Sequence, residues 1–456
     1  MSDDRPATTR ELSRSLESRH VTMITIGGVI GAGLFVGSSA AIAAAGPAVV
    51  LSYLLAGSLV FIVMRMLGEM AVAHPGIRSF TEFARRGLGD DAGFVAGWLY
   101  WYFWIIVVPI EAIAGAKILQ QWIALPVWEI GLVLMAVMTA VNLLSARSYG
   151  EFEFWFSSVK VAAILAFILV AAAHVLGVAS PAGPMLHNLA VGGGFAPKGW
   201  TPVLATATTV FFSLVGAEIT TVAAAESKDP ERAIVRMGTS ITWRILLFYV
   251  VSMLLIVTIV PWNEVVPGES PFTRTLAALG FDWGSTVMSF VILTAVLSCL
   301  NSAVYVCSRV LHVLADRGDA PRWLVEVNSR RVPARSIWLG TLAGVLGVVA
   351  ATVSPALVFA FLVNASGTLI LFIYMMTAVA QIRLRRQHPQ TEAQTVKVWA
   401  FPWLSYAALA AMAAVLIAMA CTPELASQFY VSLLAAALVT IACLLTRPSR
   451  RRGGTP

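Results

Sequence analysis

Runs of apolar residues, each about as long as a lipid bilayer is thick, recur along the whole chain. A membrane-spanning helix needs about 20 such residues, and the 456-residue sequence is 58% hydrophobic and only 12% charged. This composition excludes a soluble protein of this length. It predicts an all-α polytopic membrane protein with twelve spans, at about residues 21–43, 47–72, 94–122, 127–146, 153–177, 202–224, 239–261, 285–310, 334–353, 355–381, 400–420 and 426–446.

The basic residues gather in every second loop. They follow spans two, six, eight and ten and the last span, whereas the opposite loops hold little beyond Lys198 and Arg274. By the positive-inside rule, this pattern places both termini in the cytoplasm, which requires an even number of spans. The net charge of +7 therefore reports membrane orientation, and we expect no nucleic-acid partner. Residues 1–20 contain no apolar core with a cleavage site, so no cleaved signal peptide is expected.

The sequence predicts a single membrane domain. Since its loops are too short to fold alone, we expect a cytoplasmic segment at residues 1–20, a membrane domain at 21–446 and a cytoplasmic tail at 447–456. The six histidines form no His-Glu-x-x-His pattern, and only one of the four cysteines lies near the outer face. We therefore expect no metal, no cofactor, no disulfide framework and no enzymatic activity.

The first predicted span is unusually rich in glycine. A glycine in a helix interior costs about 1 kcal/mol relative to alanine, so the cluster indicates either close helix packing or a deliberate interruption of the helix. The glycines stand at positions 27, 28, 31, 33 and 37.

The sixth predicted span carries a related feature at its middle, where Gly216 precedes Glu218. Spans one and six occupy equivalent positions if residues 21–177 and 202–381 form two five-helix repeats, with extra helices at 400–446. Because five is odd, such repeats have opposite membrane orientations, and interrupted helices at matching positions mark a substrate site at the membrane midplane. This relation favours interruption over packing alone, and it indicates a transporter.

The chemistry of such breaks predicts a zwitterionic ligand. The amide groups of Gly31, Ala32 and Gly33 would begin a half-helix, whose positive dipole end suits a carboxylate. Carbonyl groups near residues 212–215 would suit an ammonium group.

Ionisable side chains also lie deep within predicted spans, where a charge costs about 2.5 kcal/mol or more and is usually functional. Burial disfavours the charged form of Lys160, which would let it gain and lose a proton; alternatively, it remains a fixed cation that braces helices. Glu218 could meet a substrate ammonium group, take a proton or hydrogen-bond the backbone, and Glu111 is a comparable candidate. Arg65 and Glu69, four residues apart near a membrane boundary, indicate a structural ion pair or interface anchoring.

Several separate motifs carry a family resemblance. On these motifs, the chain resembles the amino acid–polyamine–organocation superfamily, specifically the bacterial amino acid permease family and most of all its γ-aminobutyrate permeases. The similarity runs from Arg19 to the twelfth span. The motifs include residues 30–35 (IGAGLF), 65–70 (RMLGEM), 149–155 (YGEFEFW), 225–230 (AESKDP) and 298–302 (SCLNS).

This resemblance implies the five-plus-five inverted-repeat fold of the leucine-transporter type with two additional helices. It also implies proton-coupled amino acid uptake across the bacterial inner membrane. By the same resemblance, the backbone of Ala32 and Gly33 would hold the substrate carboxylate, while Val29, Phe212 and Val215 would offer carbonyls to the amine. Phe212 is also the implied aromatic gate.

Further residues are assigned by the same resemblance. Lys160 matches the helix-five lysine that replaces a sodium ion in proton-coupled relatives, and Glu218 matches the acidic residue that gates the site. Many relatives carry Thr or Ser where this chain has Ala32, so a hydroxyl contact to the carboxylate would be absent. The remaining candidates flank the second break or lie in span eight: Ser213, Gly216, Ser298 and Asn301.

The sequence thus predicts import of γ-aminobutyrate or a related amino acid with a proton, by alternating access and driven by the proton gradient. Two alternatives stay open: an exchanger without net proton movement, and a permease for proline, aromatic, basic or other α-amino acids. A channel is disfavoured, because paired helix breaks suit a closed midplane site.

Overall fold

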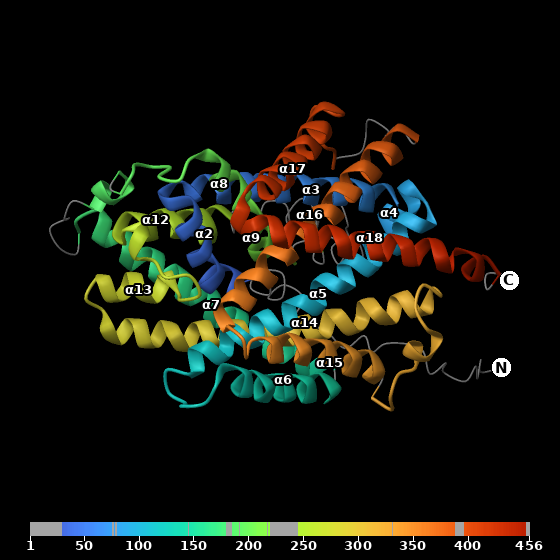
Figure 1. The fold of residues 1–456 in the computed structure, drawn as a ribbon, viewed down its shortest axis with the longest axis horizontal. Coiled ribbons are helices and arrows are strands. Elements are labelled where there is room, and N and C mark those ends of the chain that lie inside the picture. Colours follow the sequence, from blue (N-terminus) through green and yellow to red (C-terminus); the bar gives the residue numbers. More distant parts are fainter. Residues whose placement is uncertain are drawn as a thin grey trace, which may run out of the picture.

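The computed structural model describes residues 30–74, 77, 80–144, 146–178, 185–190, 192–216, 218, 245–330, 332–387 and 396–452. All regular structure in these ranges is helical (Figure 1). Within them, eight helices are long and apolar enough to cross a membrane. Three shorter apolar helices complete the set, at Trp200–Leu214, Ile245–Ile259 and Ala334–Ala350. The predicted all-α membrane class is therefore confirmed.

The first described helical segment is short and ends in a bend. A π-helical turn leads into a short α-helix, which ends at Gly46 (φ +66°). A left-handed backbone of this kind favours glycine, and Pro47 starts the next turn, so the chain bends before the second long helix. The elements are η1 (Gly33–Gly37), α2 (Ser38–Ala45), η2 (Gly46–Ala48), α3 (Val49–Ala73), α4 (Thr81–Leu88), α5 (Asp90–Leu119), α6 (Val127–Leu144), α7 (Ala146–Val175) and η3 (Met185–Leu189).

The described C-terminal half is likewise built from long helices and short helical segments. Its elements are α8 (Trp200–Ala205), α9 (Ala207–Leu214), η4 (Ile245–Val251), α12 (Ser252–Ile259), η5 (Trp262–Glu264), α13 (Pro271–Ala278), α14 (Asp282–Asp316), η6 (Arg322–Val325), α15 (Ala334–Ala350), α16 (Pro355–Gln387), α17 (Trp403–Cys421) and α18 (Pro423–Arg452). These helices overlap the predicted spans, but residues 21–29 and 219–244 lie outside the described ranges. The count of twelve spans and the inverted repeat therefore stay predictions.

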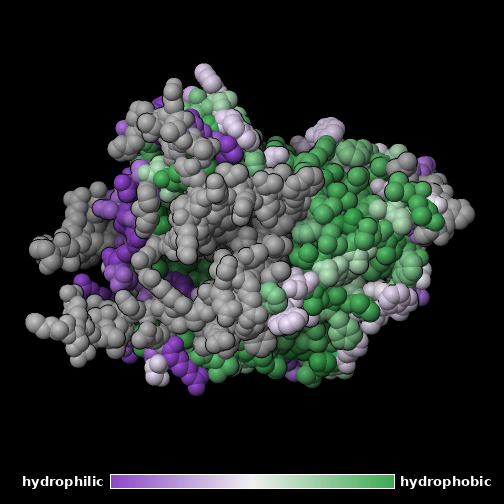
Figure 2. Space-filling view, turned by 180° about the vertical axis from the view of Figure 1, so that it is seen from behind, coloured by the Kyte–Doolittle hydropathy of each residue, from purple (hydrophilic) through white to green (hydrophobic). Residues whose placement is uncertain are grey.

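Two long helices, α5 and α14, form the centre of the molecule (Figure 1) and share its most extensive helix–helix contact. In the most apolar 18-residue stretch of α5, 83% of the residues are buried, whereas in the corresponding stretch of α18 only 11% are buried. Figure 2 shows a broad hydrophobic surface, with hydrophilic residues mainly toward the ends of the molecule. A surface of this kind fits contact with lipid chains.

Short helices in the connections pack one end of the bundle. The predicted spans include no helix at these places, yet α4 forms about two helical turns over its eight residues and buries Phe83 and Ala84. Ion pairs join Arg85 of α4 to Asp319 and Glu82 to Arg317, both partners lying just beyond α14. Helix α4 and the C-terminal ends of α14 and α18 lie on the same side of the molecule (Figure 1).

The ion pair expected within α3 has a different partner. Glu69 pairs with Arg385 of α16 at 3.0 Å and accepts a hydrogen bond from Gln381 at 2.8 Å. The Arg65 guanidinium lies 3.9 Å from the centre of the Trp399 ring and donates to the Lys397 carbonyl. Glu69 therefore ties α3 to α16, and Arg65 ties α3 to the segment between α16 and α17.

Candidate functional site

The helix of the sixth predicted span is broken. Helix α9 ends at Leu214, and Val215 follows in an extended conformation (ψ 152°). The chain then turns through Gly216, whose φ of +106° is accessible mainly to glycine. In the first span, helical structure begins at Ala32, after the non-helical residues Ile30 and Gly31. Val29, whose carbonyl is predicted to accept a hydrogen bond from the substrate amine, lies outside the described residues.

Where helical structure begins in the first span, a buried carboxylate accepts hydrogen bonds from the backbone. The Ala32 N–H donates to both oxygens of Glu111 on α5, at 3.1 and 3.3 Å. Ala32 is fully buried and Glu111 is 2% exposed. The amide that the sequence assigned to a substrate carboxylate thus binds a carboxylate of the protein itself.

The second break has a similar arrangement with more donors. The Gly216 N–H donates to the Glu218 carboxylate at 3.0 Å. Glu218 is fully buried next to the break after Leu214. Tyr100 of α5 and Tyr374 of α16 each donate a hydroxyl hydrogen bond to Glu218 at 3.1 Å. Glu218 therefore joins three separate segments of the chain.

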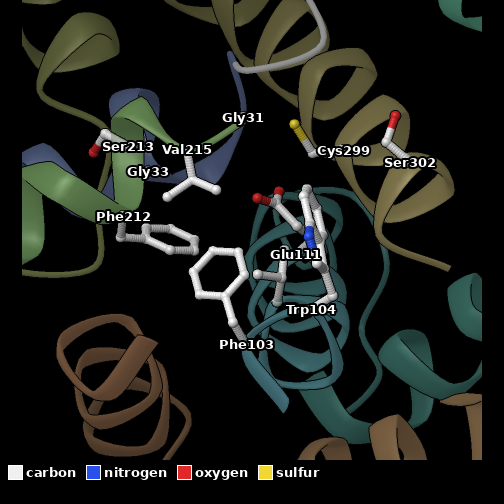
Figure 3. Close-up of a pocket in the computed structure, with 11 residues that line it drawn as sticks. Gly31, Gly33, Phe103, Trp104, Glu111, Phe212, Ser213, Val215, Cys299 and Ser302 are labelled. Carbon is white, nitrogen blue, oxygen red and sulfur yellow. The ribbon is translucent and has the colours of Figure 1, made fainter. Parts of the chain in front are cut away.

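A small cavity lies between the two breaks (Figure 3). Its volume of about 30 Å³ has room for about two water molecules, so an amino acid would not fit. In Figure 3 the rings of Phe103 and Phe212 point toward one another next to Val215 and Glu111. The lining residues are Gly31, Gly33, Phe103, Trp104, Val107, Glu111, Phe212, Ser213, Val215, Cys299 and Ser302.

Two of the clustered glycines are required by close contacts. A Cβ on Gly33 would lie 2.8 Å from Ser213 Cα, so the backbones of η1 and α9 touch at this point. A Cβ on Gly31 would collide with Cys299 Sγ and would lie 2.9 Å from Glu111 Oε1. Gly37 differs, since a Cβ there would meet its nearest neighbour at an ordinary 3.6 Å.

Lys160 of α7 is fully buried and is not among the residues that line the cavity. Its Nζ donates to Ser298 Oγ at 2.7 Å and lies 3.7 Å from Glu153 Oε1. Ser302, which lines the cavity, donates to the other Glu153 oxygen at 3.2 Å. These contacts connect the lysine to the cavity through hydroxyl groups.

Glu153 was missed by sequence reasoning. It stands at the first residue of the predicted fifth span, where a charge is expected at the membrane interface, yet the structure buries it completely. Its spacing from Lys160 was the available signal, because seven residues are about two helical turns and place both side chains on one face.

The structure brings together most of the candidate residues, but not all. Asn301 accepts a hydrogen bond from Asn142 of α6 at 2.8 Å, which ties α14 to α6, and it does not line the cavity. Gly216 and Glu218 adjoin the second break, while Ser298 belongs with Lys160. Whether these residues bind substrate stays a prediction.

Comparison with known proteins identifies the family. The amino acid permease model matches residues 20–451, nearly the whole chain. This chain belongs to the amino acid permease family. It is therefore a multi-pass membrane transport protein, and the resemblance seen in its motifs is confirmed.

Individual permeases match it over similar lengths. A γ-aminobutyric acid permease of Bacillus subtilis is 43% identical over 96% of this chain and 94% of that one. The γ-aminobutyric acid permease of Escherichia coli is also 43% identical, over 97% and 95% of the two chains. An aromatic amino acid transport protein of Corynebacterium glutamicum is 36% identical over 98% of each chain.

Proposed function

We propose that this permease imports γ-aminobutyrate, or a closely related amino acid, together with a proton by alternating access. Two γ-aminobutyric acid permeases at 43% identity support this substrate, and the aromatic amino acid transporter is more distant at 36%. The proposed architecture has ten helices in two inverted repeats, about 21–177 and 202–381, and two more helices at 400–446. Both termini would face the cytoplasm of a bacterial cell.

The hydrogen bond from Ala32 to Glu111 carries this proposal. It supports an amide N–H that donates to a carboxylate at the first break, and a carboxylate is the group that one end of an amino acid presents. Glu111 is bound there by one backbone donor, whereas three donors bind Glu218. Since a hydrogen bond contributes about 1 kcal/mol net, a substrate carboxylate would replace Glu111 more easily than Glu218. The substrate amine would then face the carbonyls near Phe212 and Val215.

Substrate entry requires the cavity to expand. Its present volume of about 30 Å³ is smaller than any amino acid, and the rings of Phe103 and Phe212 close it on one side (Figure 3). We therefore assign these rings to a gate that turns aside when the site opens. Alternating access requires a site that opens first to one side of the membrane and then to the other. A closed cavity fits the state between these two openings.

Three buried ionisable residues are the proposed coupling group: Glu111, Lys160 and Glu218. Removing Lys160 with Lys160→Ala should abolish accumulation driven by a pH gradient. Undiminished accumulation by a correctly folded Lys160→Ala protein would remove this residue from the coupling group.

The decisive experiment uses proteoliposomes that contain no internal substrate. An imposed pH gradient, acid outside, should drive labelled γ-aminobutyrate inward above its equilibrium level, and a protonophore should prevent this. An obligate exchanger would show no uptake until substrate is loaded inside.

A competition panel tests the substrate. β-Alanine should compete with labelled γ-aminobutyrate, whereas proline, aromatic and basic amino acids should compete weakly. Competition by α-amino acids alone would show that the substrate assignment is wrong while leaving the transport mechanism intact.

A further inference from the structure

We propose that a wide cavity at the C-terminal end of α5 is a second binding site, which captures a zwitterionic amino acid between Lys117 and Glu269. The captured amino acid then passes to the central cavity between the two helix breaks. The inference rests on the proposed import and membrane orientation, in which the C-terminal end of α5 faces the outside. It adds a capture step that precedes transport.

The second cavity lies further along two of the helical segments that line the central one. Val36 of η1 lines it and stands three residues beyond Gly33, which lines the central cavity. Ala114 of α5 lines it as well, three residues beyond Glu111 of the central cavity. Three residues are about one helical turn, and both segments run toward the predicted outer face. An imported substrate would therefore pass the second cavity on its way to the central one.

The two cavities differ in size. The second has a volume of about 330 Å³, whereas the central one has about 30 Å³. Sites that bind small molecules have volumes of about 300–1,000 Å³. The second cavity can therefore hold an amino acid in the present conformation, before the gate of the central cavity moves.

The charges of the second cavity suit a zwitterion. Lys117 and Glu269 are the two charged residues among those that line it. In the part of the chain that the structure describes, neither of them belongs to an ion pair. Two opposite charges that share a cavity without pairing are complementary to a ligand that carries both charges. The carboxylate of an amino acid would bind at Lys117, and its ammonium group would bind at Glu269.

The backbone next to Glu269 fixes the position of Lys117. Lys117 Nζ donates to the Gly268 carbonyl at 3.1 Å, and the Gly268 N–H donates to Ser39 Oγ of α2 at 2.9 Å. A Cβ at position 268 would lie 2.9 Å from Lys117 Nζ, so glycine leaves the space that the ammonium group occupies. Because a lysine ammonium group has three donors, the bond to Gly268 leaves two for a carboxylate.

A hydroxyl group in the same cavity points to a polar ligand independently of the charges. Ser270 Oγ is buried and has no hydrogen-bond partner among the described residues. Ser270 precedes α13, where a serine commonly caps the helix, yet its side chain forms no such bond. A buried polar atom without a partner is unfavourable. A carboxylate bound at Lys117 would offer this hydroxyl an acceptor.

The first test measures the uptake kinetics of labelled γ-aminobutyrate in Lys117→Gln, which removes the charge but keeps a hydrogen-bond donor. We expect KM to rise at least about tenfold while kcat changes less than about twofold, because capture is lost and the central cavity is intact. Lys198→Gln is the matched control, since Lys198 also donates to a backbone carbonyl, that of Ala43 at 2.8 Å, but does not line the cavity. An unchanged KM in Lys117→Gln would overturn the inference.

Glu269→Gln tests the other end of the ligand. Glu269 is exposed and lies between helices, so this variant should fold, and it decides the matter if Lys117→Gln does not. We expect KM to rise at least about threefold. Glu264→Gln is the control, because Glu264 pairs with Arg274 at 3.0 Å and does not line the cavity. Equal KM values in Glu269→Gln, Glu264→Gln and wild type contradict the capture of a zwitterion.

Chemical restoration of the charge separates ligand binding from anchoring of the loop. Lys117→Cys is made together with Cys421→Ser, which removes an exposed thiol, and whole cells are treated with membrane-impermeant methanethiosulfonates. A trimethylammonium reagent restores a positive charge at position 117 without a hydrogen-bond donor for Gly268, whereas a sulfonate reagent adds a negative charge. The first should lower KM to within about threefold of wild type, and the second should not. Equal KM values after both treatments, or no reaction from outside, would sink the inference.

The outcome for wild type separates the possible failures. If wild type imports another zwitterionic amino acid instead of γ-aminobutyrate, the proposed substrate is wrong, and the same variants measured with that amino acid decide the inference. If wild type imports no zwitterion, the inference falls with the proposed function. Normal import by wild type with unchanged KM in both Lys117→Gln and Glu269→Gln contradicts the inference alone.

Discussion

Replacing Gly33 by alanine should damage the transport site, whereas the same change at Gly37, one turn further on, should not. A Cβ at position 33 would lie 2.8 Å from Ser213 Cα and 3.0 Å from Phe212 Cδ1, well inside ordinary contact. Because the nearest atom belongs to the backbone, η1 and α9 would have to separate by several tenths of an ångström. At position 37 the nearest atom, the Ala32 carbonyl oxygen, is 3.6 Å away.

The magnitude follows from these contacts. Overpacking costs about 1–3 kcal/mol, and the better helix propensity of alanine returns about 1 kcal/mol at either position. If the contact between η1 and α9 shapes the substrate cavity, the remaining cost of up to about 2 kcal/mol corresponds to a rise in KM of up to about thirtyfold. Gly37→Ala should leave KM unchanged and should unfold at the same temperature as wild type or a slightly higher one.

The assay combines uptake of labelled γ-aminobutyrate in proteoliposomes with thermal unfolding of each purified variant, followed by tryptophan fluorescence. Equal KM values for Gly33→Ala and Gly37→Ala would refute the reasoning, since the two positions differ in the contact made with α9. Equal damage at both positions would indicate instead that the helix itself needs the flexibility of glycine.

Three other changes probe the remaining contacts. Glu218→Ala should lower the unfolding temperature more than Tyr374→Phe, because it leaves three donors without their acceptor and each costs about 1–3 kcal/mol; differential scanning fluorimetry measures both. Asp319→Ala should speed hydrogen exchange across α4, since it removes the ion pair that joins Arg85 to the chain beyond α14 and leaves this arginine only its nearby partners Glu82 and Asp90; unchanged exchange would contradict the role of that ion pair. Gly367→Ala would drive a Cβ into the Thr208 carbonyl of α9, so we expect loss of folded protein in size-exclusion chromatography.

The long helices could be predicted from the sequence because burial in lipid imposes a local rule. Every spanning helix must satisfy its own backbone hydrogen bonds and present apolar side chains over its length, and that rule can be recognised in a window of residues. The short helices α4 and α13 escaped prediction because tertiary contacts stabilise them. A Cβ on Gly87 of α4 would lie 2.9 Å from Ala380 Cα on α16, a contact between segments far apart in the chain.

The candidate site shows the same division between local and distant information. The break after Leu214 and the tight packing at Gly33 leave local signals, because glycine and small residues are needed where they occur. The partner of the Ala32 amide leaves no local signal in the sequence, since Glu111 lies 79 residues further along the chain. Glu153 is intermediate, because its spacing from Lys160 is local while its bonds to α14 are not.

The four buried glutamates in the spans differ in the groups that bind their carboxylates, and these partners distinguish them better than their positions within the spans do. In sequence they are alike, each an acid within or next to an apolar run. In the part of the chain that the structure describes, Glu69 contacts an arginine and Glu153 a lysine, whereas the hydrogen bonds of Glu111 and Glu218 come from neutral donors at the two breaks. A buried charge bound only by neutral groups remains costly. Under the proposed proton coupling, Glu111 and Glu218 are therefore the groups at which binding of a proton or a substrate ammonium group would relieve most of this cost.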